Sequence, residues 1–432
     1  MSKTQTAAMM PGAEVILKVM EAEGVDVIFG YPGGAVLPIY DALFKNNSIR
    51  HILVRHEQAA VHAAEGYARS TDKVGVVLVT SGPGATNAVT GLLDALMDSV
   101  PVICLTGQVP THLIGNDAFQ EADTTGITRP ATKHNYLVKK SEDLSRVMHE
   151  AFYVAKSGRP GPVVIAISEE MQKRMASVPD IGPANVLPPH PAPDAVSRMM
   201  AMLGKAKRPL AVLGGSRWSD QGKADIRDFL LANDLPVAVG FRRQGIFDGT
   251  SENYVGDLGV GADPGLVAHA KDADLIIAIG SRLGETFSQG YTLLDMAGAT
   301  PIVHVYPEQA EIGRVYRPAL GITADLNAFA AAAKAAAPIK KPAWAGWTRD
   351  LRATRMKQAA APDYEGPLNL AKALQALEKA LPANTIYTTD AGNFATWPTR
   401  FMHVGAGQDF LGPTNGAMGY AVPSAIGAKI VY

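Results

Sequence analysis

Short apolar runs that alternate with helical segments constrain the fold of this chain more than any other feature of its sequence. In the first part of the chain these runs are apolar at nearly every position, which predicts strands buried on both faces of a parallel sheet. We expect strands at 25–29, 52–54, 74–79 and 102–105, the second of them short and buried, and helices at 12–23, 36–44, 57–70 and 85–97. The sequence therefore predicts an α/β fold with a doubly wound parallel sheet.

The same pattern recurs further along the chain and predicts additional domains. A chain of 432 residues, of which 47% are apolar, can form two or three hydrophobic cores. Proline-rich linkers are expected at 187–193 and 338–342. We expect a first domain over 8–172, a central domain over 195–337 and an incomplete third domain over 365–432. The strands expected after the first domain are 209–213, 236–239, 275–279, 302–305 and 385–389.

The charge and cysteine content exclude several classes of protein. The formal net charge is −1, and acidic and basic residues are interspersed, so no surface for nucleic acid or anionic membrane is predicted. The single cysteine, Cys104, lies in an apolar run and is expected to be buried as a small hydrophobic residue. We find neither a signal peptide nor an apolar run long enough to span a bilayer, which favours a cytoplasmic protein.

Glu57 occupies the position where open α/β sheets bind ligands. The expected strand 52–54 ends just before it, and an alanine-rich helix begins with it. Ligands of such sheets bind at the carboxyl ends of the parallel strands. Carboxylates are also common in the first helical turn because they complement the helix dipole. The position of Glu57 is therefore suggestive only in combination with its neighbours.

A glycine-rich turn follows the expected strand 74–79. Its sequence, Ser81-Gly82-Pro83-Gly84, lacks the Gly-Lys-Ser/Thr ending of a P-loop and does not match G-x-G-x-x-G. Glycines in a tight turn between strand and helix often serve backbone geometry alone. A nicotinamide dehydrogenase built on the same kind of sheet is disfavoured, because no dinucleotide fingerprint with a downstream acid follows the first strand.

Several motifs in one order resemble the pyrimidine-binding domain of thiamine-diphosphate enzymes, and most closely the acetolactate synthase large (catalytic) subunit family. They extend over more than a third of the chain, which makes the resemblance specific. The motifs are Pro32-Gly33-Gly34, Arg55-His56-Glu57-Gln58-Ala59-Ala60, Thr80-Ser81-Gly82-Pro83-Gly84-Ala85-Thr86-Asn87, Leu105-Thr106-Gly107-Gln108, Asp117-Ala118-Phe119-Gln120-Glu121, Thr132-Lys133-His134-Asn135-Tyr136 and Ser157-Gly158-Arg159-Pro160-Gly161-Pro162.

This resemblance implies a cofactor site in the first domain. Glu57 would be the carboxylate that hydrogen-bonds the far pyrimidine nitrogen of thiamine diphosphate and so promotes removal of the thiazolium C2 proton. Phe119 and Gln120 would line the entrance beside the reactive ring, although ordinary packing would also explain a phenylalanine. The remaining residues expected to contact the cofactor in this domain are Pro32, Gly33, Gly34, Gly82 and Asn87.

The resemblance also assigns the last part of the chain to a diphosphate-binding domain. Met418 would wedge between the two cofactor rings and the Gly416 carbonyl would hold the amino group, although a methionine alone would be read as core. The ligands of Mg²⁺ are expected beyond Tyr432, and no metal ligand is predicted within the chain. The residues expected near the diphosphate are Ala391, Gly392, Asn393 and Phe394.

In the relatives the central domain holds FAD, which takes no part in the net chemistry. Two departures predict that FAD binding here is weak or absent. Ser168-Glu169 stands where the relatives have a Pro-Lys pair, and Leu283-Gly284-Glu285-Thr286 lacks the arginine that faces the second keto acid. Glycine commonly follows a strand in α/β proteins, so the glycines among the expected FAD contacts could also have a purely structural role. Residues that match expected FAD contacts are Arg159, Gly214, Gly215, Gly280, Arg282, Glu308 and Asp325.

The implied activity is decarboxylation of a 2-keto acid such as pyruvate, followed by carboligation to a second keto acid, as in branched-chain amino acid biosynthesis. A homodimer or homotetramer and a regulatory subunit are the implied partners. Two alternatives stay open. One is a different thiamine-diphosphate 2-keto-acid decarboxylase or lyase. The other is a truncated, inactive relative that acts at most as a binding protein.

Overall fold

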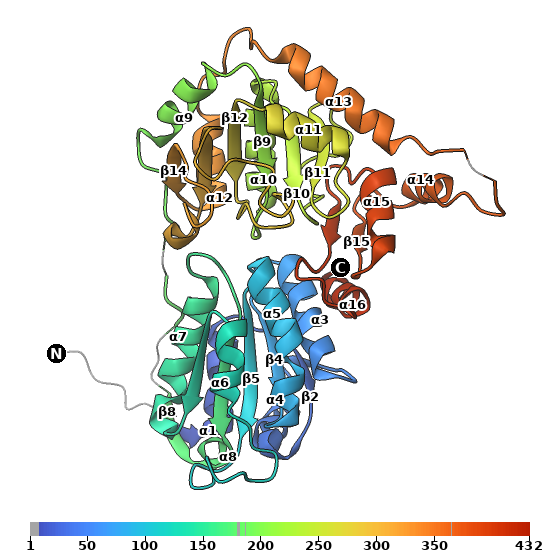
Figure 1. Cartoon of the computed structure of the whole chain (residues 1–432). Helices are drawn as coiled ribbons and strands as arrows, with labels where there is room; N and C mark the ends of the chain where they lie inside the picture. Colours follow the sequence, from blue (N-terminus) through green and yellow to red (C-terminus); the bar gives the residue numbers. More distant parts are fainter. Residues whose placement is uncertain (1–7, 179–181, 186, 364) are drawn as a thin grey trace. The chain divides into compact units, whose positions relative to one another are not determined.

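The computed structural model describes residues 8–178, 182–185, 187–363 and 365–432. The chain divides into two compact units (Figure 1). Unit 1 comprises Met1–Val186 together with Asn415–Tyr432, and unit 2 comprises Leu187–Thr414. Each unit contains its own six-stranded sheet and its own hydrophobic core. The alternation of strands and helices in the sequence therefore produces two separate α/β bodies.

The central sheet of unit 1 has six strands in the order β3-β2-β4-β5-β7-β6. All five neighbouring pairs are parallel, as predicted for this part of the chain. The strands are β2 (Val27–Tyr31), β3 (Arg50–Leu53), β4 (Gly75–Val79), β5 (Val102–Gln108), β6 (His134–Val138) and β7 (Val163–Ser168). Separately, β1 (Ala8–Pro11) pairs antiparallel with β8 (Met175–Val178).

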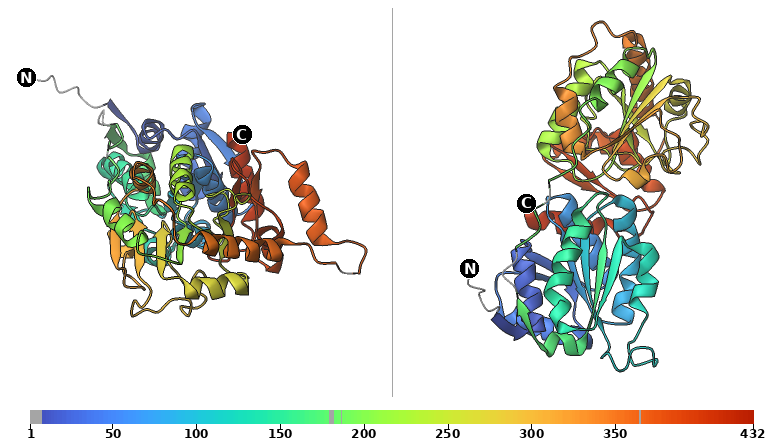
Figure 2. Two further views of the ribbon diagram at one scale, coloured as in Figure 1. Left: turned by 90° about the horizontal axis from the view of Figure 1, so that it is seen from above. Right: turned by 90° about the vertical axis from the view of Figure 1, so that its left-hand side faces the viewer.

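Side chains of unit 1 alternate between two cores, one on each face of the sheet. Ile28 and Leu78 belong to one core, whereas Phe29 and Val79 belong to the other. Helices cover both faces, so the sheet is doubly wound as predicted (Figure 2). The helices of unit 1 are α1 (Gly12–Ala22), α2 (Leu37–Lys45), α3 (Glu57–Arg69), α4 (Pro83–Asn87), α5 (Val89–Asp98), α6 (Thr124–Thr128), α7 (Leu144–Lys156), α8 (Glu169–Lys173) and α16 (Ala421–Val431), with short 3-10 turns at Gly34–Val36, Arg129–Ala131 and Ser141–Asp143.

The prediction that residues 52–54 form a buried strand is wrong in its burial. Strand β3 lies at the edge of the sheet, its central residues are half-buried, and Leu53 is 54% exposed. An apolar run of three residues cannot distinguish an edge strand from a central one. The connection from β3 to α3 accordingly includes two exposed residues, Arg55 and His56.

Helix α16 lies along α3 within unit 1 at very short range. A Cβ atom on Gly66 would lie 2.2 Å from the carbonyl oxygen of Ser424, and one on Gly427 would lie 2.0 Å from that of Ala63. Glycine at both positions therefore allows the two main chains to meet. The last described residues of the chain thus belong to the same compact body as the Glu57 helix.

Unit 2 repeats the architecture with strand order β11-β10-β9-β12-β13-β14, again parallel throughout. Its strands are β9 (Pro209–Leu213), β10 (Val237–Gly240), β11 (Tyr254–Leu258), β12 (Leu275–Ile279), β13 (Ile302–Tyr306) and β14 (Leu320–Thr323). Its helices are α9 (Ala195–Leu203), α10 (Asp220–Ala232), α11 (Pro264–Asp272), α12 (Leu326–Lys334), α13 (Ala345–Ala359), α14 (Leu370–Ala380) and α15 (Thr396–Phe401), with 3-10 turns at Gln309–Glu311 and Asn393–Ala395.

The segment predicted as a third domain is distributed over both units. Residues 365–414 belong to unit 2, where β15 (Ile386–Thr388) and β16 (Asp409–Leu411) form a two-stranded parallel sheet. Residues 415–432 belong to unit 1. The described part of this segment is therefore not a complete doubly wound sheet, and the three-domain division stays a prediction.

Candidate functional site

Glu57 is the first residue of α3 and is held there by a local cap. His56 has extended backbone, and its ring Nδ1 accepts a hydrogen bond from the main-chain N–H of Gln58 at 3.1 Å. The Glu57 carboxylate lies in the first helical turn, where the helix dipole favours a negative charge. Only 6% of Glu57 is exposed. The structure thus places a carboxylate inside the protein at a helix start.

Two polar side chains from neighbouring segments surround this carboxylate. The Asn87 side-chain amide donates a hydrogen bond to Glu57 Oε2 at 3.0 Å. The Thr80 side chain borders the same space, and its buried hydroxyl has no hydrogen-bond partner among the described residues. Buried polar groups are normally satisfied, so an unpaired hydroxyl beside a buried carboxylate is consistent with a polar ligand.

Glycines in two predicted motifs make room around Glu57. Gly82 has φ of +53°, and a Cβ there would lie 2.5 Å from the Gln120 carbonyl oxygen. A Cβ on Gly84 would lie 2.8 Å from Thr80 Cγ2 and 3.5 Å from Glu57 Oε1. A Cβ on Gly33 would meet the Thr80 side chain at 2.5 Å. The structure therefore brings Gly33, Gly82, Gly84 and Gln120 to one place.

The remaining predicted residues of this site are more exposed. The Phe119 side chain is 89% exposed, so the packing explanation does not apply to it within this chain. Gln120 has φ of +60°, in the left-handed region. Pro32 and Gly34 are exposed at the end of β2. The roles predicted for these side chains stay predictions.

Met418 lies next to the beginning of α3 within unit 1. Its main-chain oxygen accepts a hydrogen bond from Gln58 Nε2 at 2.8 Å. The Met418 side chain is 75% exposed, so it is not a core methionine. Gly416, two residues before it, has φ of +81°, a conformation that favours glycine. The segment assigned to the cofactor rings therefore contacts the residue that follows Glu57.

Sequence reasoning missed a buried cluster on the inward face of α3. His62 Nδ1 lies 2.9 Å from Glu65 Oε1 and 3.8 Å from Asp94 Oδ2, and all three side chains are fully buried. One turn further along, Arg69 forms an ion pair with Asp98 at 3.2 Å. The sequence feature that could have revealed this cluster is the pair His62 and Glu65, which stand three positions apart on an otherwise alanine-rich helix.

This cluster has strongly perturbed acids. Burial raises the pKa of Glu65 well above its usual range, and the negative charge of Asp98 adds to that effect. Burial, then repulsion by Glu65 and Asp98, raises the pKa of Asp94 to about 10. The ring nitrogen and one oxygen of each of these two carboxyl groups lie within 4.8 Å of one another, a spacing typical of metal ligands. A proton held by the two acids also accounts for this spacing.

In unit 2 the glycines predicted to contact FAD pack closely against one another and against neighbouring residues. A Cβ on Gly280 would lie 2.5 Å from the Gly214 carbonyl oxygen, and one on Gly214 would lie 2.8 Å from Ser281 Cα. A Cβ on Gly215 would lie 2.9 Å from Leu326 Cδ1. Close packing of the ends of β9 and β12 therefore explains these glycines without a ligand.

The charged residues of the FAD set also have partners within the protein. Arg282 Nε donates to Glu311 Oε2 at 3.1 Å, and Asp325 Oδ1 caps α12 by accepting from the main-chain N–H of Asn327 and Ala328 at 2.9 and 3.0 Å. Glu308 is half-buried and precedes the turn Gln309–Glu311. These contacts give Arg282 and Asp325 structural roles in unit 2.

Arg159 belongs to unit 1 and stabilises the end of α5. Its guanidinium group donates to Ser99 Oγ at 3.0 Å and to the Leu96 carbonyl. Ser99 has a left-handed conformation at the helix end, and a cation there satisfies free carbonyl groups. The contacts of Arg159 are therefore those of a helix cap.

The residues predicted to bind the diphosphate form a turn in unit 2. Gly392 has φ of +148°, and a Cβ on it would lie 2.7 Å from the Phe394 ring. Asn393 begins the following 3-10 turn, and the Ala391 N–H donates to Asp390 Oδ1 at 2.9 Å. Phe394 is 56% exposed. This turn and the Gly416–Met418 segment belong to different units, so each stands by itself.

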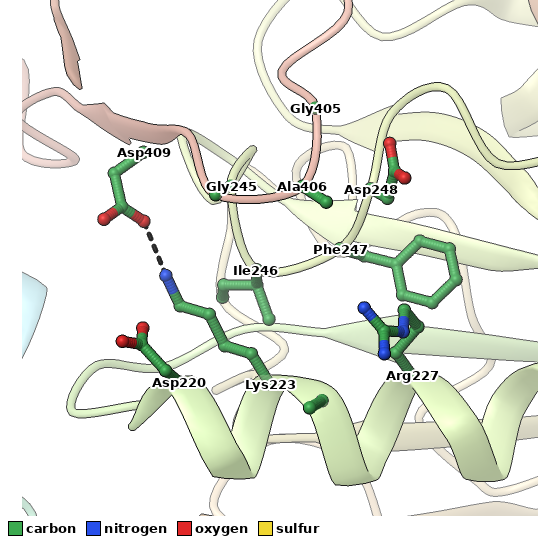
Figure 3. Close-up of a pocket in the computed structure, with 12 residues that line it drawn as sticks. Asp220, Lys223, Arg227, Gly245, Ile246, Phe247, Asp248, Gly405, Ala406 and Asp409 are labelled. Carbon is green, nitrogen blue, oxygen red and sulfur yellow. Dashed lines mark hydrogen bonds and ion pairs between the residues drawn. The ribbon is translucent and has the colours of Figure 1, made fainter. Parts of the chain in front are cut away.

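Unit 2 also contains a pocket between α10 and the loops 245–248 and 405–409. Figure 3 shows Lys223 reaching from α10 to Asp409, with which it forms an ion pair at 2.6 Å. Arg227 lies further along the same helix, near Phe247. No residue predicted to contact a cofactor is among the described residues that line this pocket.

Comparison with known proteins places the two sheets in one family of enzymes. Residues 10–127 match the family model of the thiamine pyrophosphate enzyme N-terminal TPP binding domain, and residues 196–333 match that of the central domain. The acetolactate synthase isozyme 2 large subunit of Escherichia coli is 36% identical over 429 residues, covering 98% of this chain and 76% of that protein.

Two further relatives are also acetolactate synthases. The acetolactate synthase large subunit of Corynebacterium glutamicum is 36% identical over 432 residues, which are 97% of this chain and 68% of that protein. Acetolactate synthase 1, chloroplastic, of Nicotiana tabacum is 35% identical over 440 residues, which are 97% of this chain and 64% of the tobacco protein. The chain belongs to the acetolactate synthase large-subunit family. It is thus a thiamine-diphosphate-dependent enzyme by family, as predicted from its motifs.

The departures from the acetolactate synthase pattern have local structural explanations. Ser168 ends β7, and Glu169 begins α8, where it forms an ion pair with Lys173 at 2.6 Å. An acid in the first helical turn is favourable. Leu283 has φ of +51° and is 2% exposed. The Leu283 side chain is therefore buried in this chain, at a position where the sequence departs from the acetolactate synthase pattern.

Across the residues that the structure describes, no helix is both long and apolar enough to cross a membrane.

Proposed function

We propose that this chain catalyses the thiamine-diphosphate-dependent decarboxylation of a 2-keto acid such as pyruvate and transfers the product to a second keto acid. The observation that carries the proposal is the buried Glu57 carboxylate, bonded by Asn87 and faced by glycines at the carboxyl edge of a parallel sheet. Family membership supports the same reaction.

The residues around Glu57 fit the pyrimidine half of the cofactor. Glu57 Oε2 is held by Asn87, whereas Oε1 faces the space that a side chain on Gly84 would occupy. Thiamine diphosphate, when bound, supplies the carbanion chemistry of such enzymes. Glu57 would exchange a proton with the far pyrimidine nitrogen, and burial would keep water from competing for that proton. The unpaired Thr80 hydroxyl would offer a further polar contact.

The other predicted residues complete the proposal. Met418 would position the rings from the opposite side, and the Gly416 carbonyl would accept from the amino group. Phe119 and Gln120 would contact the keto acid, which accords with the exposure of the Phe119 side chain. The turn of Ala391, Gly392, Asn393 and Phe394 would contact the diphosphate. A diphosphate also requires a hard cation such as Mg²⁺ with oxygen ligands, to which we assign no residue of this chain.

For unit 2 we propose that FAD affinity is weak or absent. The close approach of Gly214, Gly215 and Gly280 to neighbouring main chain and side chains supports this, as does the pairing of Arg282 with Glu311. The test is the absorption spectrum of the purified protein. A flavin spectrum with near-stoichiometric FAD would refute this part of the proposal.

The proposed partners are a second copy of the chain, in a homodimer or homotetramer, and a regulatory subunit. The names of the relatives support the second, because they are called large subunits. A cytoplasmic location is also proposed, and it is supported by the composition of the chain alone. The names of the relatives do not support it, because two tobacco relatives are named chloroplastic. Sedimentation analysis of the purified protein would test the assembly.

The decisive experiment uses the protein at its natural length with pyruvate, with and without thiamine diphosphate and Mg²⁺. We expect cofactor-dependent formation of 2-acetolactate. Formation of acetaldehyde alone would favour the second candidate, a different thiamine-diphosphate decarboxylase. The loss of the acceptor-facing arginine at Leu283-Gly284-Glu285-Thr286 is the observation that keeps this candidate open. No binding of thiamine diphosphate would overturn both.

A further inference from the structure

We propose that Gln58 is a positioning residue of the thiamine site, because its amide, oriented by His62, holds the main-chain carbonyl of Met418. The proposal rests on the function proposed above, in which Met418 lies beside the cofactor rings. Gln58 follows Glu57 on α3, so one helical turn would carry both the reacting carboxylate and the group that positions the opposite wall of the site.

The direction of each hydrogen bond follows from the acceptor at one end. A main-chain carbonyl can only accept, so the Gln58 atom at 2.8 Å from Met418 O is the NH₂ nitrogen. The same nitrogen lies 3.2 Å from His62 Nε2. Because that nitrogen already donates and has no lone pair to offer, His62 Nε2 must be the acceptor. His62 is therefore the tautomer with its proton on Nδ1.

The other end of the imidazole fits this tautomer. His62 Nδ1 lies 2.9 Å from Glu65 Oε1, which accepts the Nδ1 proton. The ring is also packed edge-on against Tyr420, at 5.2 Å between ring centroids. Glu65, His62 and Gln58 thus form one chain of hydrogen bonds along the inward face of α3. The chain ends at the Met418 carbonyl.

The buried acids Glu65 and Asp94 fix the orientation of the His62 ring and of the Gln58 amide. Glu65 Oε2 and Asp94 Oδ2 are buried, and neither has a hydrogen-bond partner among the described residues. A proton shared by the two carboxyl groups would satisfy both oxygens, while Arg69 faces Asp98 on the far side. Glu65 Oε1 then remains free to accept from His62. This arrangement leaves the amide of Gln58 one orientation only.

The consequence concerns the segment that follows Gly416. The Met418 side chain is 75% exposed, so side-chain burial contributes little to its position. The Gln58 hydrogen bond therefore supplies a fixed point for its main chain. Losing one hydrogen bond of this kind should weaken cofactor binding about 3- to 10-fold. The effect should fall on cofactor affinity more than on kcat at saturating cofactor.

The first test examines the relay without the cofactor. Nitrogen-15 spectra of the histidine-labelled protein, with the His62 signals assigned from His62→Asn, report which ring nitrogen carries the proton. We expect an unprotonated Nε2 in the wild type and a changed Nε2 signal in Gln58→Met. A protonated Nε2 in the wild type would overturn the proposal, because the amide of Gln58 would then be reversed.

The second test, on the protein at its natural length, measures the dissociation constant of thiamine diphosphate with Mg²⁺ by calorimetry. Gln58→Met removes the amide at similar length, and Gln58→Glu places an acceptor against the Met418 carbonyl, so we expect a larger loss for Gln58→Glu. Gln221→Met is the matched control. Gln221 is also the second residue of its helix, α10, and its amide bonds only Asp225 among the described residues, at 2.8 Å.

The outcomes separate this proposal from the proposed function. If the wild type binds thiamine diphosphate and both Gln58 variants bind it equally well, only the positioning role is overturned. If the wild type does not bind it, the proposed function fails, and the positioning role fails with it. If Gln58→Met does not fold, circular dichroism will show this, and Gln58→Glu alone decides. Glu65→Gln should preserve affinity, because its amide oxygen still accepts from His62.

Discussion

The glycines at the strand ends of the two units have opposite effects. In unit 1, Gly33, Gly82 and Gly84 border a buried carboxylate and an unpaired hydroxyl, which leaves polar groups available to a ligand. In unit 2, Gly214 and Gly280 let the ends of two neighbouring strands meet, and the nearby charges are paired. The same kind of doubly wound parallel sheet and the same residue type therefore leave polar groups open to a ligand in one unit and give close packing in the other.

The strongest test of this difference is Glu57→Gln. The amide is nearly the same size, so the fold should survive, but it cannot exchange a proton in the same way. We expect a loss of about 10²–10⁴-fold in kcat, the usual contribution of general acid–base catalysis. Steady-state kinetics with pyruvate and the rate of deuterium exchange at the cofactor C2 would measure it.

The matched change in unit 2 is Glu311→Gln. Glu311 is equally buried but bonds Arg282 and Arg314, so its loss should lower the free energy of unfolding and leave kcat unchanged. If Glu57→Gln and Glu311→Gln reduced kcat alike, the functional distinction between the units would be lost.

Gly280→Ala should destabilise unit 2. Gly280 has φ of +74°, and the new Cβ would meet the Gly214 carbonyl oxygen at 2.5 Å. We expect a loss of roughly 1–3 kcal/mol in the free energy of unfolding, measured by urea denaturation. The control is Gly284→Ala, whose Cβ would have no neighbour within 4 Å. Equal stability of the two variants would show that close packing does not require Gly280.

Asp94→Asn should change how stability depends on pH. Below about pH 4, both folded and unfolded chains hold the Asp94 proton, whereas above it only the folded chain does, because its pKa is raised to about 10. The contribution of Asp94 to the free energy of unfolding therefore falls as pH rises, by up to about 1.4 kcal/mol per pH unit. Asp94→Asn removes that slope, and urea titrations between about pH 5 and 8.5 would detect it. Parallel curves for variant and wild type would contradict the shared proton.

The smallest expected effect is that of added FAD. If the glycines of unit 2 are fully used by main-chain packing, FAD should not shift the thermal midpoint, whereas thiamine diphosphate with Mg²⁺ should raise it. Differential scanning fluorimetry compares the two ligands directly. A clear rise with FAD would mean that both units carry a cofactor site.

Much of the fold was predictable, because the buried parallel strands are mostly apolar and alternate with helices. The sequence could not show that β3 is an edge strand, since burial depends on which strands are neighbours. Helix α13 was not predicted, because its apolar residues follow no clear helical stripe. Family motifs located Glu57, Gly82 and Asn87 together, and the structure brings them to one place.

The parts of the site that were not predicted depend on contacts between distant segments. His62 and Glu65 stood three residues apart in the sequence, but the role of Asp94 became visible only when α5 was placed against α3. Arg159 matches a flavin contact by its motif, and in the structure its guanidinium group caps α5, a contact that the motif did not reveal. A motif identifies a residue but does not tell which neighbour satisfies its charge.

The glycine contacts between α3 and α16 limit how this chain can be engineered. Because Gly66 and Gly427 hold two main chains at distances that no side chain tolerates, a substitution at either would push the helices apart as rigid rods. Glu57 begins one of these rods, so the displacement would reach the carboxylate directly. Libraries that seek a different acceptor should therefore keep both glycines and vary the exposed residues around Phe119 instead.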